Sequence, residues 1–331
     1  MGEVHNQLIT GSRTWAEYEP QHIANMDLFR TGYAARDIVF DAFRKYCKSL
    51  PADVSEVVLE RQRILRDAGI SEEDIAKQEA SFCTAVFPNT TPTMYWAIYE
   101  LFSRSDVLGE VRRELVANAV SRGTTPEGDK EGNFSLDVVS LKTRCPLLLS
   151  VYQETQRTRS VNALVRKVLD DTLLDGRYLL KKGNFLMVPS APIHNNTATW
   201  GSSAENFDAH RFVPKASPAS GAAADNSANS GGGGSNASHF MAWGAAPHLC
   251  PARQFASTEI LIVLALMAMR IDLRPIGGGW QKNPAVVTGD IATVLSPVKD
   301  VRVEVGVRKD WVGQWRIEMG ESRAKVPIAS G

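Results

Sequence analysis

Apolar side chains recur at helical spacing through the first half of the chain, and this pattern predicts a largely helical protein. Five segments share it: residues 34–46, 54–68, 71–103, 107–120 and 146–157. Ser71 and Asp74 stand at the start of the longest segment in the arrangement of a capping box. Pro88 and Pro92 fall inside that segment, and because each removes a backbone donor we expect a local kink or widening there.

Strand patterns are short and follow the last of these helices. Four runs of branched and aromatic residues come in succession: residues 165–168, 173–174, 178–180 and 185–188. The dipeptides Asp175-Gly176 and Lys182-Gly183 lie between such runs and predict hairpin turns. A further strand is expected where residues 301–307 alternate between apolar and polar. The predicted fold class is therefore mainly α with small β-sheets.

Composition and charge are those of an ordinary globular protein. The chain has 331 residues, of which 44% are hydrophobic, and its 37 basic side chains balance 37 acidic ones. A neutral chain gives no reason to expect a nucleic-acid partner. The four cysteines lack C-x-x-C spacing, which argues against a disulfide framework or a zinc site. The longest apolar stretch, residues 260–269, is too short to cross a bilayer, so we expect no transmembrane segment and a soluble chain as written.

One segment departs from the rest in composition. Residues 215–238 are rich in Ala, Ser, Gly and Asn and include four consecutive glycines. Such a segment cannot bury enough apolar area to offset its ordering entropy, so we expect a disordered insertion. No internal repeat is evident, and residues 1–331 are otherwise expected to form a single domain.

Cys250 is the residue that points most directly to chemistry. It stands just before a long apolar helix pattern, and Pro251 suits the first position of that helix. A thiolate at such a place faces unpaired backbone N–H groups and the positive end of the helix dipole. A lone cysteine is nevertheless more often a small buried hydrophobe, so its surroundings must decide.

Three segments together carry a resemblance to a known family: Trp243-Gly-Ala-Ala-Pro-His-Leu-Cys250-Pro-Ala-Arg253-Gln-Phe-Ala256, Glu154-Thr-Gln-Arg157 and Phe207-Asp-Ala-His-Arg211-Phe212. In content and order they resemble the cytochrome P450 family. The chain departs from the family pattern at Trp243, where phenylalanine is usual, and at Ala246 and Ala252, where glycine is usual. The resemblance implies a cytochrome P450-like fold, of which this chain is the C-terminal portion, and an N-terminally truncated haem domain.

The resemblance also implies a cofactor, haem b. Cys250 would be the axial thiolate and thus the metal ligand, and Trp243 would be an aromatic lid over its sulfur. Arg166 and His248 would contact the haem propionates, since a guanidinium pairs bidentately with a carboxylate. The alternatives are a surface arginine on a strand for Arg166 and an ordinary loop histidine for His248.

The same resemblance assigns a structural network to Glu154, Arg157 and Arg211. Glu154 and Arg157 are three residues apart on a helix, so their side chains can meet. Taken alone, such a pair is as well explained by a solvated surface ion pair of little energetic value. By the resemblance the three would lock the core near the proximal side of the haem. His194 and Trp200 would also be structural.

The oxygen chemistry would belong to the long helix with the prolines. Asn89, Thr90 and Thr91 precede Pro92, and Trp96 follows, which resembles the branch with steroid 7α-hydroxylases, prostacyclin synthase and related fungal enzymes. Asn89 would stand where many P450s have a threonine, with its amide orienting water or bound oxygen. No carboxylate is evident there as a proton source. The alternative is that Asn89 only bonds to carbonyls freed by Pro92.

The function implied is a haem-thiolate monooxygenase that hydroxylates or epoxidises a lipophilic small molecule. A terpenoid, steroid or polyketide of secondary metabolism is expected, with O2 and with electrons from NADPH-cytochrome P450 reductase. Substrate contacts are expected at residues 86–87, 161–164 and 292–295. A haem-thiolate isomerase or dehydratase, a non-catalytic P450 fragment and an unrelated helical interaction protein stay open as alternatives. Full-length relatives are usually anchored in the endoplasmic reticulum membrane, and the location of this chain is left open.

Overall fold

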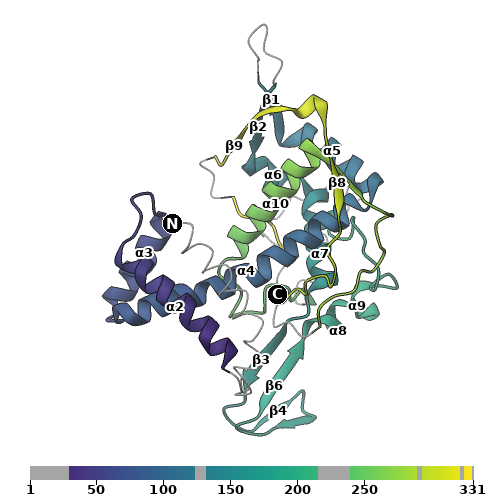
Figure 1. Ribbon diagram of the computed structural model, residues 1–331. Coiled ribbons are helices and arrows are strands. Elements are labelled where there is room, and N and C mark those ends of the chain that lie inside the picture. The colour runs from purple at the N-terminus through teal and green to yellow at the C-terminus, as the bar shows by residue number, and fades with distance from the viewer. Residues whose placement is uncertain (1–29, 124–131, 215–238, 289–292, 321–323, 330–331) are drawn as a thin grey trace, which may run out of the picture. The chain divides into compact units, whose positions relative to one another are not determined.

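The computed structural model describes residues 30–123, 132–214, 239–288, 293–320 and 324–329 (Figure 1). These residues form two compact units, whose boundary falls between Thr91 and Pro92. The first unit contains the described residues up to Thr91 with Val287 and Thr288, and the second contains the remainder. The single domain expected for the whole chain stays a prediction. The low-complexity segment, residues 215–238, lies outside the described residues.

The first unit consists of helices: α2 (Thr31–Lys48), α3 (Glu56–Asp67) and the first part of α4 (Glu72–Phe102). The predicted helix start at Ser71 is confirmed, because the Asp74 N–H donates to Ser71 Oγ at 3.1 Å and the Ser71 hydroxyl donates to Asp74 Oδ2 at 2.8 Å. Helix α4 continues without a break through Pro88 and Pro92. The prolines therefore do not end the helix.

The second unit is built around buried helices: α5 (Ser105–Asn118), α6 (Val138–Arg144), α7 (Pro146–Arg159), α10 (Arg253–Arg270) and the last part of α4, with the short α8 (Ser190–His194), α9 (Thr197–Trp200) and η2 (Lys309–Trp311). Leucines of α5, α7 and α10 form the centre of its hydrophobic core, among them Leu115, Leu148 and Leu264. Helix α7 is buried on all sides along most of its length, from Leu147 to Arg157. Its polar side chains must therefore find partners inside the protein.

The sheets of the second unit are small. In the largest, β1 (Val120–Arg122) pairs antiparallel with β2 (Gly132–Asp137), which pairs parallel with β9 (Gly313–Glu318). Three antiparallel pairs complete the set: β3 (Ala163–Lys167) with β6 (Phe185–Pro189), β4 (Thr172–Leu174) with β5 (Tyr178–Leu180), and β7 (Ile271–Pro275) with β8 (Val303–Val307). The predicted class, mainly α with small β-sheets, is confirmed.

One predicted hairpin is wrong. Asp175-Gly176 does turn the chain between the paired strands β4 and β5, with both residues at positive φ. Lys182-Gly183 instead leads from β5 to β6, which belong to different sheets. The Gly183 N–H donates to the carbonyl of Val168 at 2.8 Å, and this bond continues the β3–β6 ladder. A turn dipeptide fixes the local bend, whereas the pairing depends on residues far away in the sequence.

In the part of the chain that the structure describes, no helix combines the length and the apolar character needed to cross a membrane.

Candidate functional site

A closed turn holds Cys250 in front of α10. The Cys250 N–H donates to the carbonyl of Trp243 at 2.9 Å, and the Gly244 N–H donates to the carbonyl of Met241 at 3.0 Å. Cys250 itself is half-buried and its thiol is free. The turn is thus fixed by backbone atoms and leaves the side chain of Cys250 partly accessible.

Gly244 is the position at which this turn requires glycine. Its φ is 86°, in the left-handed region that L side chains rarely adopt. A Cβ there would lie 3.1 Å from the carbonyl oxygen of His248 and 3.8 Å from Leu164 Cδ2. Ala246 is not among the described residues with positive φ, and the peptide bond that joins it to Pro247 is cis. Alanine in place of glycine at position 246 is therefore compatible with this turn.

The expected start of the helix after Cys250 is wrong by two residues. Helix α10 begins at Arg253, with Ala252 at the N-cap, so Pro251 is not its first residue. The reason is local, because the Arg253 N–H at 3.3 Å and its guanidinium at 3.0 Å both donate to the carbonyl of Cys250. Pro251 and Ala252 form the tight turn that these bonds close.

The other residues expected to bind the cofactor lie on this turn and on β3. The Trp243 Nε1 is buried and has no hydrogen-bond partner among the described residues. His248 is exposed, on the same turn. Arg166 is exposed on β3, and its guanidinium donates to the neighbouring carbonyl of Val165 at 3.0 Å. The basic groups of Arg166 and His248 are therefore accessible, and neither is held in an ion pair within the described chain.

Two buried hydroxyl groups that the sequence did not single out lie beneath the turn. Tyr152 of α7 and Ser257 of α10 share a hydrogen bond of 3.0 Å between their hydroxyl groups. Burial raises the pKa of the Tyr152 phenol, and the negative charge of a Cys250 thiolate raises it further.

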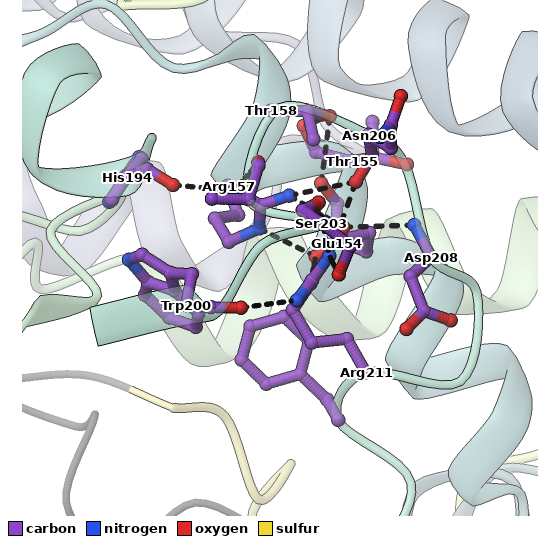
Figure 2. Close-up of polar contacts among 12 residues, drawn as sticks. Glu154, Thr155, Arg157, Thr158, His194, Trp200, Ser203, Asn206, Asp208 and Arg211 are labelled. Carbon is purple, nitrogen blue, oxygen red and sulfur yellow. Dashed lines mark hydrogen bonds and ion pairs between the residues drawn. The ribbon is translucent and has the colours of Figure 1, made fainter. Parts of the chain in front are cut away.

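Glu154, Arg157 and Arg211 form one buried network (Figure 2). The Arg157 guanidinium makes a fork to both oxygens of Glu154, at 2.8 and 2.7 Å. The Arg211 Nε donates to the same oxygens at 3.0 and 3.1 Å, and the Asp208 N–H donates to Oε1 at 3.0 Å. The side chains of Glu154 and Arg157 are both fully buried. The solvated ion pair considered from the sequence is therefore excluded.

Two guanidinium groups share one carboxylate here, and backbone carbonyls accept their remaining N–H groups. Arg157 donates to the carbonyls of His194, Ala204 and Asn206, and Arg211 donates to those of Trp200, Ser203 and Asn206, as Figure 2 shows in part. The network therefore fixes the whole segment from α8 to Arg211 against α7.

His194 links this network to the Cys250 turn. Its carbonyl accepts from Arg157, and its Nε2 accepts from the Met241 N–H at 2.9 Å. Burial lowers the pKa of His194 to about 4, and the positive charge of Arg157 contributes to this shift. The imidazole is consequently neutral at pH 7. Because Nε2 accepts a hydrogen bond, the ring proton lies on Nδ1.

Asn89, Thr90 and Thr91 lie together on α4, in the first unit, whereas Cys250 belongs to the second. The Asn89 amide donates to the carbonyl of Ala85 at 3.1 Å. Asn89 and Thr90 are half-buried and Thr91 is exposed. These three residues are thus neighbours, as expected, and their relation to Cys250 stays a prediction.

Two of the three segments expected to contact substrate lie side by side. Ser160 and Val294 form an antiparallel bridge, and the Val161 N–H donates to the carbonyl of Thr293 at 2.8 Å. Residues 161–164 and 293–295 are therefore joined through Val161 and Thr293, although more than a hundred residues separate them. Residue 292 and the side chains of residues 86 and 87 lie outside the described part.

Sequence reasoning missed a second charged cluster, which includes Arg159, the residue before Ser160. Glu100 is buried near the end of α4 and pairs with Arg104 and Arg159, in each case at 2.5 Å. One signal was available, because a carboxylate in the apolar run Trp96-Ala-Ile-Tyr-Glu-Leu-Phe102 is an unusual choice unless it is paired.

Comparison with known proteins agrees with the motifs. The sequence pattern of the family described as "Cytochrome P450" matches residues 39–289. The chain belongs to the cytochrome P450 family. The cofactor of this family is a haem whose iron is bound by a cysteine thiolate. The recognition from the sequence is thereby confirmed.

Three similar proteins are two fungal P450 monooxygenases and one mammalian hydroxylase. Cytochrome P450 monooxygenase nodJ of Hypoxylon pulicicidum is 32% identical over 278 residues, covering 84% of this chain and 52% of the relative. A cytochrome P450 monooxygenase of Gibberella zeae is 28% identical, covering 91% and 57%. The 25-hydroxycholesterol 7-alpha-hydroxylase of Rattus norvegicus is 26% identical, covering 67% and 53%. The chain spans about half the length of these curated P450 relatives.

The glycine of the turn provides a test of the Cys250 geometry. We expect Gly244→Ala to destabilise the protein by more than the roughly 1–2 kcal/mol that a left-handed alanine costs, because its Cβ would also press on the His248 carbonyl. Gly183→Ala is the matched control, since Gly183 has φ 88° and open space around its Cβ position. Urea unfolding of both variants measures the difference, and equal losses would contradict the close contact at Gly244.

The buried network provides a second test. We expect Glu154→Gln to cost about 3–5 kcal/mol of unfolding free energy, because it leaves two buried guanidinium groups without a counter-charge. The control is Glu110→Gln, which removes an exposed carboxylate 2.9 Å from His210 and should change stability by about 0.5 kcal/mol or less. Chemical denaturation at pH 7 measures both, and a small loss for Glu154→Gln would show that the network is not the anchor described.

The depressed pKa of His194 predicts a pH dependence. Above pH 6.5 this imidazole is neutral in both the folded and the unfolded chain. Between pH 6.5 and 4 only the unfolded chain takes up the proton. The unfolding free energy of the protein should therefore fall, as the pH is lowered through this range, by up to about 1.4 kcal/mol per pH unit. His194→Gln should lack this component and His210→Gln should keep it. Identical slopes in all three proteins would contradict a neutral buried His194.

Proposed function

We propose that this chain is the haem-thiolate part of a monooxygenase in which Cys250 binds the iron of haem b. The observation that supports this most directly is the closed turn from Met241 to Cys250. It fixes the backbone on both sides of the cysteine and leaves the free thiol partly accessible in front of α10. A structural cysteine would instead be expected inside the core, as Cys145 is.

The surroundings of Cys250 fit a haem. The Trp243 Nε1 is a buried donor without an acceptor, which is costly unless a bound group supplies one. Arg166 and His248 are exposed basic groups that would hold the two carboxylates of the haem, the arginine by a bidentate contact. The residues present therefore match the polar and the charged parts of the cofactor.

When bound, the haem supplies the oxygen chemistry, because the cysteine thiolate pushes electron density to the iron and favours O–O cleavage. The protein holds that thiolate in place through the backbone bond from Cys250 to Trp243 and through the start of α10. The Glu154 network keeps the neighbouring segment fixed through His194 and Met241. Its role is structural, and none of its members handles substrate.

Asn89, Thr90 and Thr91 would handle protons on the oxygen side. Each threonine Oγ1 can accept one hydrogen bond and donate another, so the two hydroxyl groups can pass a proton between waters. The Asn89 Nδ2 donates, and its Oδ1 can orient a water molecule. Because this triplet contains no carboxylate, the proton would reach it from outside the triplet, through water.

The substrate would be a lipophilic small molecule of the terpenoid, steroid or polyketide type, which the enzyme hydroxylates or epoxidises. The relatives support this class, since two are fungal monooxygenases and the rat relative is named as a hydroxylase of 25-hydroxycholesterol. The electrons would come from NADPH-cytochrome P450 reductase, with O2 as the oxidant. A chain that converts a peroxide without NADPH would instead be an isomerase or dehydratase.

A carbon monoxide difference spectrum of the reduced, haem-supplemented protein tests the assignment. We expect a red-shifted Soret band of the thiolate type in the wild type, and its loss in Cys250→Ser, because a serine oxygen does not supply the thiolate ligand. Cys47→Ser is the matched control, since Cys47 is also a half-buried free cysteine, and it should keep the band. A band that survives in Cys250→Ser would exclude Cys250 as the ligand. A wild type without the band would leave a fragment that does not hold haem.

A further inference from the structure

Trp96 makes a contact that joins α4 to a segment far along the sequence, residues 293–295. Its indole is fully buried, and its Nε1 donates to the carbonyl of Leu295 at 2.7 Å. Leu295 lies 199 residues further along the chain and belongs to the segment 293–295. A buried hydrogen bond of this kind holds a carbonyl that would otherwise be left without a partner.

Arg159 covers the Trp96 indole and is itself held by Glu100. The Arg159 guanidinium lies 4.0 Å from the centre of the Trp96 ring, a cation–π contact. Its Nε and Nη2 both donate to Glu100 Oε1, at 3.1 and 2.5 Å. Glu100 is itself buried and paired with Arg104. Trp96 therefore cannot turn without breaking contacts that involve a buried charge.

The carbonyl that Trp96 holds belongs to a segment bonded to the residues just before β3. Val294 bridges Ser160, and the Thr293 carbonyl accepts from the Val161 N–H at 2.8 Å. Ser160 directly follows Arg159, so the cation over the indole and the bridge to Val294 come from adjacent residues. Trp96 therefore holds the segment 293–295 at Leu295, and the backbone bond from Val161 to Thr293 joins that segment to residues 161–164.

From β3 the contacts continue to the Cys250 turn. The Asn162 Nδ2 donates to the carbonyl of Met241 at 3.0 Å, and Leu164 lies against Gly244. Met241 and Gly244 are joined by one of the two hydrogen bonds that close the turn. A continuous series of contacts in the second unit therefore leads from Trp96 through residues 293–295 and 161–164 to the turn that holds Cys250.

We propose that Trp96 is a positioning residue that sets where residues 161–164 and 293–295 lie relative to Cys250, and thereby which bulky ligands the site accepts. This inference rests on the proposed function and on the prediction from the sequence that these two segments contact the substrate. Trp96 does not touch the substrate itself. It acts through the Leu295 carbonyl, and Arg159 holds the indole in the orientation that this requires.

Trp96→Phe is the variant that tests this, because it keeps an aromatic ring under Arg159 and removes only the donor to Leu295. Trp200→Phe is the matched control, since the Trp200 indole is also buried and also donates to a backbone carbonyl, that of Ile193 at 3.0 Å. The two variants lose the same kind of bond at different places in the second unit.

The first measurement is hydrogen–deuterium exchange of the purified protein, which does not depend on bound haem. In Trp96→Phe we expect the peptide that covers residues 160–166 to exchange about fivefold faster, because the Val161 N–H loses its fixed acceptor. Trp200→Phe should leave this peptide unchanged. Exchange that is unchanged in Trp96→Phe would overturn the positioning role.

The second measurement uses two nitrogen ligands of haem iron, imidazole and the bulky clotrimazole, followed by difference spectra. Trp96→Phe should weaken the binding of clotrimazole by about fivefold and leave the affinity for imidazole unchanged, because in this proposal only the larger ligand reaches the two segments. Equal changes for both ligands, or for neither, would contradict the inference although the carbon monoxide band is present. Without that band in the wild type, the proposed function fails, and with it the statement about ligands.

Arg159→Lys provides a second variant in case Trp96→Phe does not fold. It keeps the positive charge but loses the fork to Glu100 and the planar cover of the indole. We expect the same changes in exchange and in clotrimazole affinity, but smaller. Unchanged values for this variant would show that Arg159 does not orient Trp96.

Discussion

The buried carboxylate of Glu154 is the constraint on which the second unit depends. A charge removed from water must be compensated at close range, and here two guanidinium groups share it. These guanidinium groups are then themselves buried and need further acceptors, which the backbone of the segment from His194 to Asn206 provides. Helix α7 can only be buried on all sides if this segment folds against it. The packing of the helix and the path of the segment are therefore one requirement.

The same packing also holds the Cys250 turn, because His194 belongs to this segment and bonds to Met241. Its neutral ring accepts the Met241 N–H, at the beginning of the turn, while Asn162 of the segment before β3 donates to the Met241 carbonyl. Both polar groups of the Met241 backbone are thus held by side chains from elsewhere. The turn itself uses backbone bonds and one left-handed glycine. This explains how the chain accommodates Ala246 and Ala252 where its family usually has glycine, since neither position carries the left-handed backbone.

Sequence reasoning succeeded where the signal is local or where it is a pattern of side-chain types. Helical spacing located most of the long helices, and the capping pair Ser71 and Asp74 marked the start of α4. The strand β9 was missed, and Lys182-Gly183 was misinterpreted as a hairpin turn, because the true pairing partners lie far apart in sequence. The strands β1 and β2 pair across a short connection, and β1 was missed because it has only three residues, the first of which was assigned to the helix 107–120. The contact between Trp96 and Leu295 has no local signal at all. The order of the Glu154, Arg211 and Cys250 motifs was informative because it is a pattern of side-chain types. The start of α10 was not predictable in this way, because it depends on a turn closed by Arg253.

The buried polar atoms that remain without a partner reveal a further property of the Cys250 region. Five such atoms occur in the part of the chain that the structure describes, and three of them belong to Trp243, His194 and Asn162. Trp243 and Asn162 flank the turn directly, and His194 bonds to Met241 at its beginning. Proteins rarely leave such atoms unpaired unless a bound group or water completes them. The other two, the Tyr95 hydroxyl and Gln156 Oε1, also belong to the second unit. Three of the five unpaired atoms among the described residues thus lie around the Cys250 turn, where the haem proposed above would bring new hydrogen-bond partners.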